Sequence, residues 1–250
     1  MFSLSLLLSS MLRADELLAN SFPSNRIYIS PTWFVNDKTE EGPFGFRMSS
    51  TNIFREECGY QYSKRNSVYF YARESWGGGP GLHTLGNVKE IIFSYPWYFE
   101  SRIGYQLSLD KTMNLALTPY LGYFLLGQLT YLNSLPGLFQ KALLQNVVAG
   151  AMLDYIINKN FRVSILFNFL FGVSGEAKTG ARYVDTTVIN LQNKVNYLSE
   201  IWITWQITNY LDLTLVPSYV WENGATGYGP SAVFQTERNP GLRLELGYRI

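Results

Sequence analysis

Several segments of the chain alternate apolar and polar residues, and charged side chains fall on the polar side of this alternation. These charged side chains are the residues best placed to form specific ion pairs. Among them every cation is an arginine, and roughly as many carboxylates share the spacing. A guanidinium bonds a carboxylate through two parallel hydrogen bonds, which favours arginine over lysine in fixed ion pairs. The pattern therefore predicts internal ion pairing. The arginines are Arg26, Arg55, Arg73, Arg102, Arg162, Arg243 and Arg249, and the carboxylates are Glu57, Glu100, Asp154, Glu200, Asp212, Glu222 and Glu245.

Five of these residues, Glu57, Arg73, Arg102, Glu200 and Arg243, lie at a similar distance along their segments from the nearest polar turn, and Glu100 is a further candidate partner for the arginines. An isolated charge in an enclosed space is costly, so balanced signs favour pairing. We interpret this group as ion-pair candidates that close an internal space. The alternative is a hydrated polar lining without fixed pairs. The six candidates are Glu57, Arg73, Glu100, Arg102, Glu200 and Arg243.

The chain offers little for catalysis or metal binding. His83 is the only histidine and Cys58 the only cysteine, so intramolecular disulfides are impossible and multi-histidine or thiolate metal sites are not expected. His83 falls in a segment that we predict to be a surface loop without an adjacent acid. The run Gly77–Gly81 lacks the strand, helix and lysine of a phosphate-binding loop and is also interpreted as a flexible loop. We predict no catalytic residue, cofactor or metal.

Composition argues against a fully water-exposed surface. Aromatic residues make up 16% of the chain and charged residues also 16%, whereas soluble domains average about 25% charged residues. The formal net charge of +1 gives no electrostatic reason to expect nucleic-acid binding.

Apolar and polar residues alternate over segments long enough to cross a membrane as strands, about 9–11 residues each. In the segment 161–173, for example, Phe167 falls on the apolar side and Asn168 on the polar side. In a bilayer such alternation places apolar residues outward and polar residues inward. The other clear segments are 97–109, 211–222 and 242–250.

Connections of two lengths separate these segments. Tight polar turns occur at 64–66, 110–111, 158–160 and 208–209, and longer connections are predicted at 36–43, 77–94, 126–144, 174–194 and 223–239. Short periplasmic turns that alternate with long outer loops are typical of outer-membrane barrels. We therefore predict one all-β domain over 26–250, a transmembrane antiparallel up-and-down β-barrel of about ten strands (range about 8–12).

Three local features leave alternatives open. Residues 1–14 resemble a signal peptide without the usual basic start, with cleavage near Ala14 or Ala19, or an uncleaved segment instead. Glu56 falls on the apolar side of its segment, which indicates either a bulge or a position outside the hydrocarbon. Residues 138–144 have helix-like apolar spacing and form either a short helix at the rim or the start of a strand.

The C-terminal run resembles the last strand of bacterial outer-membrane β-barrel proteins of the small porin-like type. The resemblance covers roughly residues 26–250 as a pattern, and its most specific part is the alternation of Leu242, Leu244, Leu246, Tyr248 and Ile250. It implies recognition by the barrel-assembly machinery, location in the bacterial outer membrane, and contact with lipid and lipopolysaccharide. The family pattern normally ends in Phe or Trp, and Ile250 departs from it.

Several functions fit such a barrel. We expect a non-catalytic protein that anchors surface loops and has an ion-paired, largely closed lumen; the sequence does not identify its extracellular partner. The first alternative is a narrow porin-like diffusion channel for small solutes. The second is a barrel enzyme that acts on lipid or peptide, and a soluble ligand-binding barrel is a more distant alternative.

Overall fold

The computed structural model describes residues 25–42, 45–85, 88–110, 114–132, 139–180, 187–226 and 233–250. The expected signal peptide lies outside these residues. The described part of the chain forms ten strands. They are β1 (Asn25–Gly42), β2 (Gly45–Ser63), β3 (Ser67–Leu85), β4 (Val88–Ser108), β5 (Leu115–Leu132), β6 (Phe139–Asn158), β7 (Phe161–Gly180), β8 (Thr187–Gln206), β9 (Leu211–Thr226) and β10 (Val233–Arg249).

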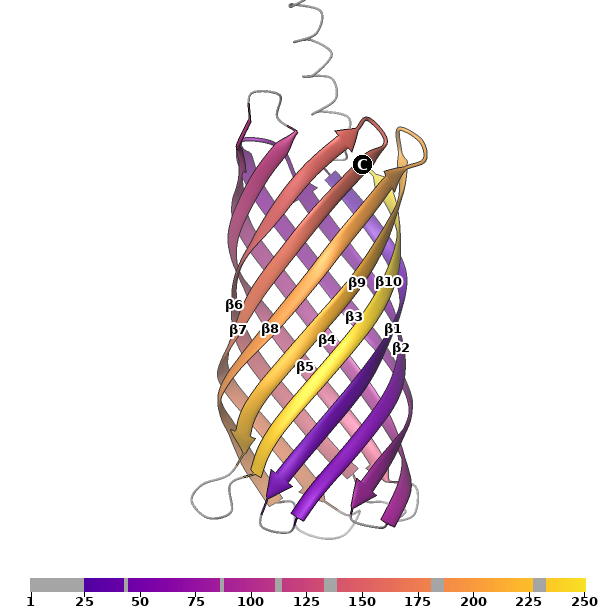
Figure 1. The fold of residues 1–250 in the computed structure, drawn as a ribbon, viewed down its shortest axis with the longest axis vertical. Helices are drawn as coiled ribbons and strands as arrows, with labels where there is room; N and C mark the ends of the chain where they lie inside the picture. The colour runs from indigo at the N-terminus through magenta and orange to yellow at the C-terminus, as the bar shows by residue number, and fades with distance from the viewer. Residues whose placement is uncertain are drawn as a thin grey trace, which may run out of the picture.

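The ten strands close into one antiparallel barrel in which each strand pairs with its neighbours in the chain (Figure 1). Pairing of β1 with β10 closes the ring, with Ile27 opposite Tyr248 and Trp33 opposite Leu242. Closure leaves no strand edge unpaired, which removes the template for further pairing. The predicted fold class and strand number are therefore confirmed. Among the described residues, no helix has the length and apolar character needed to cross a membrane.

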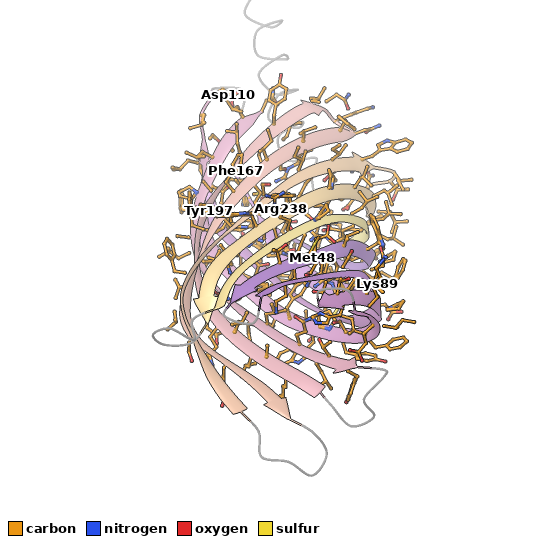
Figure 2. All side chains as sticks on the ribbon, turned by 60° about the horizontal axis from the view of Figure 1, so that its bottom comes forward. Met48, Lys89, Asp110, Phe167, Tyr197 and Arg238 are labelled. Atoms are coloured by element: carbon orange, nitrogen blue, oxygen red, sulfur yellow. The ribbon has the colours of Figure 1, made fainter. Side chains whose placement is uncertain are left out.

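Side chains alternate between the lumen and the outer face, as the sequence pattern predicts. Phe167 on β7 is 59% exposed, whereas its neighbour Asn168 is 2% exposed. Figure 2 shows the outward side chains, Phe167 and Tyr197 among them, projecting around the barrel. The inward set is more apolar than predicted. It includes a buried cluster with Met152, Leu166 and Trp202, so the lumen contains a packed core as well as polar groups.

The outer face differs between its two ends. Toward the end with the short turns, the exposed residues are mostly large and apolar, such as Ile165, Leu244 and Tyr248. Toward the opposite end the exposed set is mixed, since Lys89 and Arg238 are exposed together with Ile91 and Phe93. The strands contain 16 to 21 residues, whereas about 9–11 residues suffice to cross the hydrocarbon. The barrel wall is therefore longer than the hydrocarbon requires, and its outer face is most uniformly apolar in a band near the short turns.

The structure corrects the prediction of long loops. Only residues 43–44 separate β1 from β2, and only residues 86–87 separate β3 from β4. The run Gly77–Gly81 lies within β3, where a Cβ on Gly77 would stand 2.1 Å from the backbone oxygen of Phe54. Beyond the membrane neither face of a strand needs to be apolar, so the alternation of apolar and polar residues fades and the segment resembles a loop in sequence. The strand nevertheless remains paired with its neighbours on both edges.

Two of the open alternatives are decided by the register. The pairing of β1 with β2 continues without interruption from Asn25 to Gly42, so a bulge between these strands does not explain Glu56, whose side chain is exposed on the outer face. Strand β6 begins at Phe139. Residues 139–144 therefore start a strand, and the helix alternative is wrong for them; residue 138 lies outside the described residues.

We expect Phe167→Arg to lower the free energy of unfolding by about 2–4 kcal/mol, because it places a cation on the apolar band. The matched control is Met48→Arg, an outward position toward the opposite end (Figure 2), where the cost should be about 0–1 kcal/mol. Denaturant titration of the protein folded in lipid vesicles measures both. Equal losses at the two positions would contradict the location of the band.

Candidate functional site

The structure brings the six ion-pair candidates together in one network inside the barrel. All six side chains are buried. They come from β2, β3, β4, β8 and β10, so no local segment could assemble them. The network contains Glu57, Arg73, Glu100, Arg102, Glu200 and Arg243.

Arg73 links opposite walls of the barrel. Its Nε lies 2.7 Å from Glu100 on the adjacent β4, and its Nη1 lies 3.2 Å from Glu200 on β8. Four strands separate β3 from β8 in either direction around the ring, so these two strands stand opposite each other. The Arg73–Glu200 ion pair therefore crosses the bore.

Arg102 and Arg243 complete the network from two other walls. Arg102 Nε lies 2.5 Å from Glu100. Arg243 lies 3.2 Å from Glu200 and 3.4 Å from Glu57. Each carboxylate is thus within ion-pair distance of at least two guanidinium groups. Removing one member of such a buried network leaves another charge without compensation.

Neutral aromatic side chains supply hydrogen bonds that the sequence did not predict. The hydroxyl groups of Tyr28 and Tyr98 both donate to Glu57, and Trp202 Nε1 donates to Glu200 at 2.9 Å. Tyr28 fits because Gly59 lacks a Cβ, which would stand 2.4 Å from the tyrosine ring. The presence of Tyr and Trp at inward positions could have predicted these hydrogen bonds. Aromatic residues were instead expected to face outward.

A second ion cluster lies closer to the short turns. Arg162 forms a bidentate pair with Asp154, at 3.0 Å from Nε to Oδ1 and 2.6 Å from Nη2 to Oδ2. Gln106 and Ser164 also donate to this carboxylate, and Arg65 approaches it to 3.7 Å. These contacts to the buried Asp154 come from two strands, β4 and β7, and from the turn between β2 and β3.

The remaining inward charges fall into three groups. Arg26 contacts Asp212 at 2.8 Å and Glu245 at 2.9 Å, and Glu245 also joins the central network through Arg243. Arg249 is only partly buried, and the side chain of Glu222 lies outside the described residues. Arg55 differs from the other arginines, since its guanidinium lies over the rings of Phe34 and Tyr98.

The environment of His83 differs from the prediction. His83 lies in β3 rather than in a loop, and its register neighbours are Ser49 on β2 and Glu90 on β4. The prediction of no adjacent acid was therefore wrong, because strand pairing places together residues that are distant in sequence. Cys58 lies on the outer face, where its Sγ is 3.4 Å from Glu74. No group of three or more potential metal ligands occurs within the described ranges.

The C-terminal residues form the outward row of β10. Each of the five is exposed on the outer face, and Ile250 donates a backbone hydrogen bond to Asn25 at 3.0 Å. The row therefore lies at the seam where the first and last strands, β1 and β10, meet. The five residues are Leu242, Leu244, Leu246, Tyr248 and Ile250.

Comparison with solved structures finds barrels of the same kind. The outer membrane protease OmpT from Escherichia coli matches with a TM-score of 0.68 and 10% sequence identity, over 91% of this chain and 97% of that chain. The transport unit of the autotransporter AIDA-I from Escherichia coli matches with a TM-score of 0.51 and 9% identity, over 97% and 98%. No family model and no curated protein sequence matches the chain.

The chain has the fold of bacterial outer-membrane β-barrels. Together with its apolar outer band, this fold places the barrel in the outer membrane. The short turns and both ends of the barrel domain then lie on the periplasmic side, and the opposite end forms the extracellular mouth. At these sequence identities the likeness establishes the fold alone, because one fold carries unrelated functions.

Proposed function

We propose that this protein is a non-catalytic outer-membrane barrel whose lumen is closed in its resting state and whose projecting wall presents a surface outside the cell. The Arg73–Glu200 ion pair across the bore carries the proposal. Aromatic packing supports it, since the rings of Tyr71 and Trp202, also on β3 and β8, lie 5.5 Å apart between centroids. Solutes that pass the lumen would have to break contacts that are buried and mutually compensating.

Conductance across a planar bilayer tests the closed lumen. We expect the unmodified protein to show no steady current, and Glu57→Ala to raise the current because water must enter to hydrate Arg73 and Arg243. The variant should also lose about 3–5 kcal/mol of stability if the site is dry. Glu56→Ala is the matched control, because its side chain faces outward on the same strand. A steady current from the unmodified protein that Glu57→Ala leaves unchanged would instead favour the narrow diffusion channel.

One observation favours a barrel enzyme as the second candidate function. Ser49, His83 and Glu90 lie in register on three adjacent strands near the extracellular mouth. Side chains at such positions on one face have Cβ atoms about 4.5–5.5 Å apart. A serine, an imidazole and a carboxylate in this order are the groups of a nucleophile, its general base and the residue that orients the base.

A fluorophosphonate probe tests this candidate on the intact protein. If Ser49 is a nucleophile, the probe should label the barrel covalently, and both Ser49→Ala and His83→Ala should abolish the label. Ser50→Ala is the control, since Ser50 is exposed on the outer face. Absence of labelling, or labelling that survives Ser49→Ala, would exclude a catalytic role for this row.

We also propose that the outward row of β10 is recognised during barrel assembly. Deletion of Tyr248–Ile250 should leave the chain unassembled in the periplasm, measured as loss of the heat-dependent mobility shift that closed barrels show on detergent gels. Tyr248→Ser tests recognition of the outward row separately from closure of the barrel. It keeps the backbone pairing with Ile27 and Leu211 but removes the aromatic ring. Ile250→Phe should be neutral or accelerate assembly. Normal insertion of the deleted chain would refute the role.

A further inference from the structure

A small cavity lies in the lumen between the central ion network and the extracellular mouth. Its contacts on β1 run from Thr32 to Asn36, on the mouth side of Ser30, whose register partner is Glu57. The cavity has a volume of about 100 Å³. A dry apolar cavity that accommodates a benzene molecule has a volume of about 150 Å³, so this smaller space is limited to a short alkyl chain.

The walls of this cavity are mostly apolar, but its charged groups are not balanced. Apolar contacts come from around the ring, and the charged residues that line it are three arginines and one glutamate. The arginines are Arg55, Arg73 and Arg243, and the carboxylate is Glu200. Glu200 and the nearby Glu57 lie within ion-pair distance of Arg73 and Arg243. Arg55 is therefore the lining arginine that no described carboxylate pairs with directly. The main apolar contacts are Phe34, Phe124, Leu126, Leu170, Leu198 and Val220.

Arg55 is held in position without an anionic partner. Its guanidinium carbon lies 4.0 Å from the ring centroid of Phe34 and 4.5 Å from that of Tyr98. Within the described residues no carboxylate lies within 4.0 Å of it, in contrast to Arg26, Arg73, Arg102 and Arg243. Its Nε is buried without a hydrogen-bond partner in the protein. Stacking between two rings fixes the plane of the cation and leaves its edge for an acceptor.

We propose that this cavity binds small carboxylates with a short alkyl body, which enter from the extracellular mouth. Arg55 donates charge-assisted hydrogen bonds to the carboxylate, and the apolar wall around Leu198 and Val220 contacts the body of the ligand. The ion network below forms the floor of the site. Binding therefore requires no passage through the barrel.

Titration of the full-length protein in detergent micelles with sodium propionate, followed by calorimetry and corrected for micelles alone, tests the site. We expect saturable binding to one site, and propionamide should bind at least about tenfold more weakly because it has the same shape without the charge. Arg55→Gln should weaken propionate binding at least about tenfold. The control Arg238→Gln, an exposed arginine toward the same end of the barrel (Figure 2), should leave it unchanged.

A second variant keeps the test decisive if Arg55→Gln fails to form a heat-modifiable barrel. Val220→Trp fills the apolar side of the cavity while Arg55 is retained, and it should also abolish propionate binding. Absence of saturable binding, equal binding of propionate and propionamide, or unchanged affinity in both Arg55→Gln and Val220→Trp would overturn the proposal. The titration reports on the cavity and the conductance measurement on the network beneath it, so either proposal can fail alone.

Discussion

Backbone hydrogen bonding in a medium without water is the constraint on which the rest of this structure depends. A strand in hydrocarbon has no solvent to satisfy its N–H and C=O groups, so every edge must meet another strand. Closure of β1 onto β10 meets this requirement for all ten strands. Once the ring is closed, strict alternation sends every second side chain into a narrow shared interior. Charged residues placed there must find partners within that interior.

The interior solves this problem by pairing charges both along the wall and across the bore. Strand pairing places Arg73 beside Glu100, whereas Arg73 reaches Glu200 only because the barrel is narrow. Tyrosine and tryptophan donors then complete the carboxylates. The resulting core combines ion pairs with packed apolar side chains such as Leu166 and Met152. A lumen of this kind is closer to a protein core than to the water-filled lining of a porin.

The two ends of the lumen serve different purposes. Toward the periplasm the charges are compensated, as Asp154 and Arg162 illustrate with their bidentate pair. Toward the mouth, Arg55 lies between two aromatic rings with its charge available to a small ligand. The proposed function uses the compensated network as a barrier. The proposed binding site uses the upper surface of that network as its floor, so one architecture supports both.

Alternation and composition in the sequence were sufficient to predict the class of fold, the number of strands, the short turns and the inward direction of the paired charges. Each of these depends on local periodicity, as in Phe167 and Asn168, and periodicity is a property of adjacent residues. Strand length beyond the membrane was not predictable, because the pairing of Gly77–Gly81 depends on the backbone of β2 and not on apolar side chains. Arg73 and Glu200 were grouped among the ion-pair candidates, but the sequence did not show that their contact would cross the bore. The pairing of His83 with Glu90 on adjacent strands was not predicted. Only closure of the barrel sets its diameter and register, and these decide which inward side chains touch.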